Sequence, residues 1–397
     1  MQGKDIVITG IQPWDIEIGS NCKNIALEFS KKNRVLYINA PLDRNTLKSK
    51  KTDVSILKRL KMLRGEISCY EMVNKNLTVF YPNVILESIQ KAPLLSLFRW
   101  LNKINNKRFA TEINRAIKEN DFHDFLHFND SDMFRSFFMK ELLNPVISIY
   151  YIRDNLIKNP YWKKYGQFLE PELIAKSDVV VTNSLYYADY ANKFTKNSYM
   201  VGQGCDISIY DEDKNHIEIA TELKSLKNPI IGYIGYLTSR RLDIDLVRLI
   251  AQKRPDWTIV LVGPEDANFI SSDLHQFENI VFLGSKPVEE LPSYTKGFDV
   301  CINPQILNDA TIGNYPRKID EYLAMGKPTV ATWTKAMEYF TDHVYLAKNP
   351  EDYIVLIDKA LKENNEDKYN SRKKIAAEHT WGNNVDAIYN AILKINQ

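Results

Sequence analysis

The chain has 397 residues, which is too long for one typical hydrophobic core and predicts two domains. Its 52 Lys and Arg nearly balance its 50 Asp and Glu, for a formal net charge of +2, so bulk electrostatics indicate no nucleic-acid partner. The four cysteines are too scattered for a zinc site or a disulfide framework, and no apolar stretch reaches the roughly 18 residues of a membrane span. We therefore expect a cytoplasmic protein, either soluble or peripheral on the inner face of the cell membrane.

The first half of the chain alternates short apolar runs with helical patterns, which is typical of parallel sheets built from βα units. Strands are predicted in this half at Asp5–Thr9, Arg34–Asn39, Leu77–Phe80, Asp124–Phe128, Val146–Tyr151, Asp178–Thr182 and Tyr199–Val201. Helices are expected between these strands, notably at Asn21–Lys31, Pro93–Asn120 and Ser184–Lys193.

Two regions of the first half are basic. The segment from Lys48 to Arg64 carries seven Lys and Arg against Asp53 alone, and a strongly apolar helical stripe follows at 93–104 with cations just beyond it. A basic amphipathic surface can rest on anionic lipid headgroups. The alternative is that the apolar stripe is core and the charges form a solvated face. A membrane surface is thus one possible partner.

A polar segment from Asp206 to Asn228 breaks the alternation, which then restarts. Strands are predicted in the second half at Pro229–Ile234, Trp257–Val262, Ile280–Leu283, Asp299–Ile302 and Pro328–Ala331, and the tail after about residue 353 is largely helical. The fold class is therefore α/β, with two tandem Rossmann-like, doubly wound domains at 1–205 and 206–397. Such domains bind ligands at the carboxyl ends of their strands, so we expect a central cleft that both sheets face.

The second domain opens with a buried strand, a glycine-containing turn at Gly235 and two cations, Arg240 and Arg241. A guanidinium group can engage a phosphate through two parallel hydrogen bonds, so this turn is a candidate diphosphate clamp. Two solvated arginines are the alternative, and the sequence does not choose between them. A Gly-x-Gly-x-x-Gly turn is missing here and after the first strand, which disfavours an NAD or FAD enzyme.

The most informative stretch is Asn314-Tyr-Pro-Arg-Lys-Ile-Asp-Glu-Tyr-Leu-Ala-Met-Gly-Lys-Pro-Thr-Val-Ala331. It predicts a loop, a short helix with Pro316 at its first position, a glycine stop and a buried strand. Lys318 and Glu321 lie one turn apart on one face of this helix. Because a helix start also favours an anion, a phosphate together with a ribose would suit the pair. An ordinary surface helix is the alternative.

This string resembles the nucleotide-sugar signature of GT-B glycosyltransferases, specifically family 4 and its group 1 relatives. The resemblance implies that Lys318 helps hold the donor diphosphate and that Glu321 takes the ribose hydroxyl groups. It implies that Arg240 or Arg241 binds phosphate and that the last helix, about 380–397, packs on the first domain.

Three further glycine and asparagine positions enter through the same resemblance. The turn at Gly263 lies beside the nucleobase in the family, and a plain strand-ending turn is the alternative. Gly313 and Asn314 could present main-chain amides to phosphate. Many family 4 enzymes have a glutamate where Gly313 stands, and that glutamate contacts the transferred sugar. The contact with the transferred sugar is therefore missing, is made by another residue such as Asp309, or has a changed specificity.

Candidates in the first domain come from weaker matches. Gly19 and Ser20 resemble a loop that relatives place next to the donor phosphates, although Ser20 could simply cap a helix. His127 precedes Asn129 in a segment similar to the family's His-x-His turn, and a structural histidine is the alternative. Asp154 follows a strand and could orient an acceptor hydroxyl group.

The function indicated is a glycosyltransferase that moves a sugar from a nucleotide-diphosphate donor to a glycan or lipid-linked acceptor, in cell-surface polysaccharide biosynthesis. The sequence shows no Asp-x-Asp motif of the metal-dependent type and no clustered His and Cys set, so we expect no metal and no cofactor beyond the donor substrate. The resemblance implies retention of the anomeric configuration. The alternatives are a nucleotide-sugar epimerase or isomerase of the same fold and a non-catalytic binder of nucleotide sugars or glycans.

Overall fold

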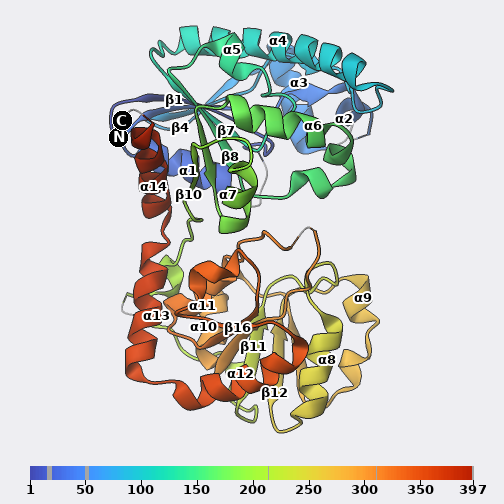
Figure 1. Ribbon diagram of the computed structural model, residues 1–397, viewed down its shortest axis with the longest axis vertical. Helices are drawn as coiled ribbons and strands as arrows, with labels where there is room; N and C mark the ends of the chain where they lie inside the picture. Colours follow the sequence, from blue (N-terminus) through green and yellow to red (C-terminus); the bar gives the residue numbers. More distant parts are fainter. Residues whose placement is uncertain (16–19, 50–52, 213, 310, 396–397) are drawn as a thin grey trace. The chain divides into compact units, whose positions relative to one another are not determined.

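The computed structural model describes all residues except 16–19, 50–52, 213, 310 and 396–397. The chain folds as two compact units (Figure 1). The first contains Met1–Asn183, Tyr187–Gly202 and Asn384–Gln397, and the second contains Ser184–Tyr186 and Gln203–Asn383. The end of the chain therefore belongs to the first unit.

The first unit is built on a largely parallel sheet. Its strands are β1 (Asp5–Gly10), β2 (Arg34–Ile38), β3 (Leu42–Asp43), β4 (Tyr70–Asn74), β5 (Leu77–Phe80), β6 (Ile85–Leu86), β7 (Leu126–Asp130), β8 (Ile147–Ile152), β9 (Val179–Thr182) and β10 (Ser198–Met200). Its helices are α1 (Asn21–Ser30), α2 (Arg44–Ser49), α3 (Val54–Leu63), α4 (Leu95–Glu119), α5 (Met139–Leu143), α6 (Pro160–Lys176), α7 (Leu185–Ala191) and α14 (Trp381–Lys394).

The main sheet of this unit has the strand order β10-β9-β8-β7-β1-β2-β5-β4. All its neighbours are parallel except the edge pair of β4 and β5, which is antiparallel. The predicted strands are present within one or two residues of their expected ends. Strand β4 was not predicted because it is mostly exposed and polar, whereas a parallel strand buried on both faces is a near-continuous apolar run.

Helices cover both faces of this sheet (Figure 1). On one face, α4 and α5 pack through Phe109, Ile113 and Met139 onto Val7 and its neighbours. On the other face, the Phe29 ring of α1 lies 5.6 Å from the Tyr389 ring of α14 and 5.6 Å from a ring on β7. The last helix is therefore part of the core of the first unit.

One buried carboxyl group in this unit predicts a pH-dependent stability. Glu170 is 3% exposed and accepts hydrogen bonds from Tyr150 at 3.0 Å and Tyr190 at 3.2 Å, and burial raises its pKa from 4.5 to about 7. The folded state therefore holds this proton more tightly, so its contribution to stability is full below pH 4.5 and is lost as the pH rises through about 7. We expect Glu170→Gln to be more stable than the parent by about 3 kcal/mol at pH 8.

Urea unfolding of both proteins between pH 4.5 and 8 checks this prediction, since the difference should shrink to near zero at the acid end. An identical pH profile for the two proteins would contradict it.

The second unit has strands β11 (Ile230–Ile234), β12 (Thr258–Val262), β13 (Ile280–Gly284), β14 (Val300–Asn303), β15 (Thr329–Thr332) and β16 (Tyr345–Ala347). Its helices are α8 (Ile244–Lys253), α9 (Ala267–Ile270), α10 (Leu291–Gly297), α11 (Lys318–Ala324), α12 (Pro350–Glu363) and α13 (Glu366–Glu378). The helical tail that the sequence predicts is thus three helices, α12, α13 and α14.

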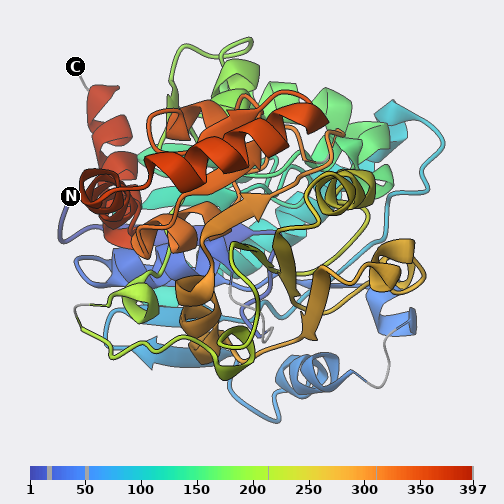
Figure 2. The ribbon, with the colours of Figure 1, turned by 90° about the horizontal axis from the view of Figure 1, so that it is seen from below.

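The sheet of the second unit is entirely parallel, in the order β13-β12-β11-β14-β15-β16. One face is covered by α8 and α12 and the other by α10 and α11, and Figure 2 shows α12 running across the strands. The α/β class with parallel sheets in two units is confirmed. The strand order reverses between β11 and β14, and ligands of doubly wound sheets bind at such a point, beyond the carboxyl ends of the strands.

Candidate functional site

Two glycines bring the ends of β11 and β12 unusually close together. Gly235 follows β11 with a φ of +144°, and Gly263 follows β12 with a φ of +145°. The Gly235 amide donates to the Val262 carbonyl at 2.9 Å, and a Cβ on Gly263 would lie 1.9 Å from the Gly235 carbonyl oxygen. No side chain fits between these turns, so bare main chain forms the sheet edge where a ligand would approach.

Lys318 reaches this edge from the first residue of α11. A Cβ on Gly235 would lie 2.7 Å from the Lys318 Nζ. The ammonium group donates a hydrogen bond to the Tyr233 hydroxyl and lies 4.0 Å from the centre of the Tyr233 ring. In the described part of the chain it forms no ion pair, so its charge is available to an anion.

The start of α11 differs from the sequence prediction. Pro316 was expected at the first helical position, but the helix begins at Lys318, and Pro316 contributes its carbonyl to the Ile319 amide at 2.9 Å. The helix has only seven residues. Anion binding here would therefore depend mainly on the side chains at its start.

Glu321 lies one turn after Lys318 and is partly buried. Burial raises the pKa of its carboxyl group, while the nearby charges of Arg317 and Lys318 and a hydrogen bond from Tyr210 oppose that rise. A desolvated carboxylate with a nearby cation is a strong acceptor for hydroxyl groups. The spacing of Lys318 and Glu321 on one face, predicted from the sequence, is present.

The inner side of α11 is fixed by a buried hydrogen bond between the side chains of Asp320 and His379. Asp320 is 0% exposed, and its Oδ1 lies 2.6 Å from Nδ1 of His379 and 3.2 Å from the Tyr315 hydroxyl. Burial raises the pKa of Asp320, and the contact with His379 opposes this. The pair holds the helix in one orientation, which keeps its outer residues at the sheet edge.

Arg240 and Arg241 lie in the loop between β11 and α8, and both are exposed. Two hydrogen bonds attach the loop to the segment after β14. The main-chain carbonyl of Arg241 accepts from the Ile306 amide at 2.8 Å, and that of Arg240 accepts from the Asn308 side chain at 3.0 Å. Within the described residues neither guanidinium group has a partner. Both remain candidates for a phosphate, as the sequence left them.

The loop before α11 partly corrects the sequence interpretation. The Asn314 amide was expected to face a phosphate, but it donates to the Thr311 carbonyl at 3.0 Å and is therefore already used in a turn. Gly313 is buried in the same turn. Gln305 holds the turn from below by donating to the Thr311 carbonyl at 2.9 Å.

Two candidate site residues of the first unit, Ser20 and His127, form hydrogen bonds that support the fold. Ser20 is the N-cap of α1 and accepts from the Lys23 amide at 3.2 Å, as the capping alternative requires. His127 lies inside β7 rather than in a turn, where its Nε2 is 2.9 Å from the Thr9 hydroxyl and burial lowers its pKa to about 4. That placement favours a neutral structural histidine. Gly19 lies outside the described residues.

Asp154 follows β8 at the carboxyl end of the first sheet, with its side chain 46% exposed. It accepts a hydrogen bond of 2.8 Å from Arg153, which also pairs with the buried Asp130 at 2.8 Å. One guanidinium group thus pairs with two carboxylates, and Asp154 keeps exposed surface.

The sequence interpretation missed the residues that support the site. Tyr233 was hidden because it lies in an apolar strand, where an aromatic residue indicates core. Tyr210 lies in the polar crossover segment, which gave no signal. His379 is 59 residues from its partner Asp320, so no local spacing could pair them.

The two-unit architecture matches solved structures over nearly its whole length. A structure of Anabaena Alr3699/HepE in complex with UDP covers 98% of this chain and 100% of its own, with a TM-score of 0.65 and 13% identity. The same protein was also solved with UDP-glucose. Sucrose-phosphate synthase from Thermosynechococcus elongatus covers 100% of this chain and 99% of its own, with a TM-score of 0.65 and 11% identity. The fold is therefore that of the GT-B class.

Sequence comparison adds a family match for part of the second unit. Residues 228–363, which lie in the second unit, match Glycosyl transferases group 1. TuaH of Bacillus subtilis (strain 168), which carries the name of a teichuronic acid biosynthesis glycosyltransferase, is 25% identical over 240 residues, 58% of this chain. The match spans 60% of the length of TuaH. These findings confirm the resemblance to GT-B glycosyltransferases of group 1 that was inferred from the sequence, with the family match confined to residues 228–363.

The described residues form neither a metal-binding cluster nor a membrane-spanning helix. Outside the few undescribed positions, no three or more His, Cys, Asp or Glu side chains are grouped so that they could hold a metal ion. Among the described helices, none combines the length and the apolar character needed to cross a bilayer.

Proposed function

We propose that this protein transfers a sugar from a nucleotide-diphosphate donor to a hydroxyl group of a glycan or lipid-linked acceptor, in the synthesis of a cell-surface polysaccharide. The observation that carries the proposal is Lys318, whose ammonium group forms no ion pair among the described residues and lies over the main-chain edge of Gly235, with Glu321 one turn away. A cation can bind a diphosphate and a carboxylate can accept from ribose hydroxyl groups, and the helix places both on one face.

UDP is the nucleotide that the comparisons favour. HepE, a protein of the same fold, binds UDP and UDP-glucose in its solved structures. In this chain the ribose would lie against Glu321, the diphosphate against Lys318 and one of the arginines of the β11–α8 loop, and the base beside Gly263.

The proposed chemistry depends on stabilising the leaving group. The bond between the anomeric carbon and the diphosphate oxygen breaks, and the diphosphate leaves with the bonding electrons. The acceptor oxygen bonds to that carbon, and its proton passes to the departing diphosphate. Fixed cations aimed at the developing charge lower the barrier without reorganising during the reaction. We propose that Lys318 and Arg240 or Arg241 supply this charge without a metal ion. Retention of the anomeric configuration rests on the family resemblance alone.

The first unit would bind the acceptor, and Asp154 would orient the acceptor hydroxyl group. A membrane-bound acceptor is supported by helix α4, where Leu94 is 63% exposed and Trp100 is 59% exposed. The exposed cations Lys103 and Lys107 follow on the same helix. Exposed apolar side chains next to lysines suit an anionic lipid surface.

Product analysis tests the proposal. Calorimetry should show saturable binding of UDP and UDP-glucose, and mass spectrometry should detect UDP release together with a new glycoside when an acceptor from a glycan and polyprenol panel is present. Conversion of the donor without an acceptor would instead identify an epimerase or isomerase. Binding without turnover would identify a non-catalytic binder, and absence of saturable UDP or GDP binding would refute the donor site.

A further inference from the structure

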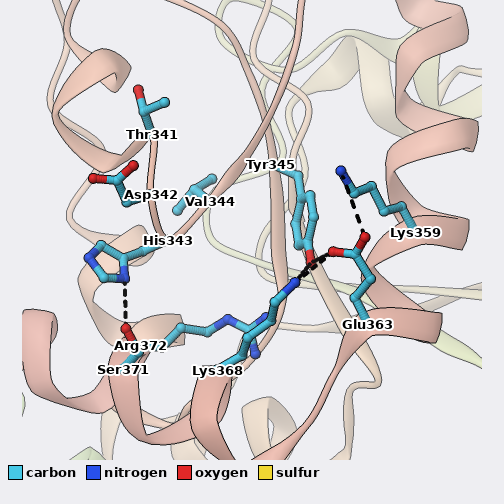
Figure 3. A pocket seen from close by; sticks show the side chains of 10 residues that line it. All are labelled: Thr341, Asp342, His343, Val344, Tyr345, Lys359, Glu363, Lys368, Ser371 and Arg372. Carbon is cyan, nitrogen blue, oxygen red and sulfur yellow. Dashed lines mark hydrogen bonds and ion pairs between the residues drawn. The ribbon is translucent and has the colours of Figure 1, made fainter.

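A separate cavity of about 260 Å³ lies in the second unit, at the amino end of β16 (Figure 3). It is lined by the segment before β16, the end of α12 and the first half of α13. The glycine turns at 235 and 263 follow the carboxyl ends of the same parallel sheet, so this cavity belongs to the opposite edge. It is therefore distinct from the proposed donor site.

The unusual group in this cavity is Arg372, which is 3% exposed. Its Nη1 donates to the Gly326 carbonyl at 3.1 Å and to the Asn364 side-chain oxygen at 2.8 Å, and both acceptors are neutral. Across the part of the chain that the structure describes, Arg372 forms no ion pair, and the neighbour that favours its charge most is the Tyr345 hydroxyl. Burial lowers its pKa.

Another buried arginine of the chain, Arg153, has carboxylate partners. Arg153 has a side chain 9% exposed and pairs with two carboxylates, Asp130 and Asp154, both at 2.8 Å. Burying a cation without a counter-charge is costly, which is why buried charges are normally paired. Arg372 lacks such a partner and lines a cavity, so an anion in the cavity would supply the missing charge.

The other lining groups add hydrogen-bond donors. Lys368 donates to Glu363 at 2.6 Å and to Tyr345 at 3.3 Å, which occupies two of its three N–H groups. Lys359 lies 3.8 Å from the same glutamate. With Arg372, the lining has three cations against two carboxylates, Glu363 and Asp342.

The remaining polar groups lie on the other side of the cavity. The Ser371 hydroxyl is 3.4 Å from Nδ1 of His343, and Figure 3 shows this pair across from Lys368 and Tyr345. Polar groups thus line opposite sides of the cavity.

We propose that this cavity binds a phosphate group, either as the free ion or on a small phosphorylated molecule, with Arg372 as the buried counter-charge and Lys368 as the second cation. A guanidinium fork can engage phosphate oxygens through parallel hydrogen bonds. The volume of about 260 Å³ is below that of roughly 300–1,000 Å³ pockets for drug-sized ligands, so the occupant is small.

Binding of inorganic phosphate, measured by calorimetry at constant ionic strength on the full chain, tests this proposal. We expect saturable binding that Lys368→Met weakens about tenfold or more and that Lys374→Met, an exposed lysine on the same helix, leaves unchanged. Arg372→Met should abolish binding, with circular dichroism to check its fold. Since Lys368→Met keeps Arg372 in place, it remains informative if that second variant unfolds.

Two further comparisons separate this site from the donor site and its possible ligands. Phosphate binding should persist in Lys318→Met, whereas UDP binding should persist in Lys368→Met; loss of phosphate binding in Lys318→Met alone would place the ion at the donor edge and overturn the proposal. Equal phosphate affinity of Lys368→Met and Lys374→Met, or no saturable binding in the parent, would also overturn it. Tighter binding of a sugar phosphate or glycerol phosphate than of the free ion would identify a phosphorylated molecule as the occupant.

Discussion

Replacing Lys318 with methionine is expected to weaken UDP binding by about 10- to 100-fold, because it removes one charge-assisted hydrogen bond to phosphate worth roughly 1.5–3 kcal/mol. The methionine keeps the aliphatic contact with the Tyr233 ring, which the ammonium group now overlies at 4.0 Å. The loss therefore reports the charge rather than the packing. Calorimetry with UDP and with uridine measures it, and uridine affinity should not change because it has no phosphate.

Two variants serve as controls for this prediction. Lys348→Met removes an exposed lysine elsewhere in the second unit and should leave UDP affinity at the parental value. Tyr233→Phe removes the hydroxyl that accepts from Lys318 but keeps the ring, so its effect should be several-fold smaller than that of Lys318→Met. Equal UDP affinity of Lys318→Met and the parent would show that the diphosphate lies elsewhere.

Replacing Gly263 with alanine is expected to disrupt the same edge through the main chain. The new Cβ would lie 1.9 Å from the Gly235 carbonyl oxygen, and a φ of +145° is itself strained for alanine. Since both partners are backbone, the turns after β11 and β12 must separate. We expect a destabilisation of about 3 kcal/mol or more and loss of measurable UDP binding.

Gly284→Ala is the matched control, because Gly284 ends the neighbouring strand β13 with a φ of +67° and nothing lies within 4 Å of its added Cβ. Only the conformational cost of about 1 kcal/mol should appear there, with UDP binding retained. Urea unfolding and calorimetry on both variants make the comparison. If Gly263→Ala behaved like Gly284→Ala, the close approach of the two turns would not be required.

Much of the fold followed from local pattern. The strands of both sheets were predicted because parallel strands buried on both faces are short apolar runs, and β1, β5 and β11 lie where such runs occur. The strands that were not predicted, β4 and β16, are not buried on both faces. Strand β4 is mostly exposed, and β16 is a three-residue edge strand that is only partly buried. Such strands are defined by their neighbours rather than by their own composition.

The sequence alone determined the class of the chain and the placement of Lys318 and Glu321 on one face of a short helix, because helical periodicity fixes which residues share a face. Only the tertiary structure decided what surrounds that face. The Tyr233 hydroxyl under Lys318, the Tyr210 hydroxyl at Glu321 and the His379 pair behind the helix all come from distant segments. The local sequence likewise does not predict the environment of His127. Its burial inside β7 follows from packing on both faces of the sheet and not from the residues beside it.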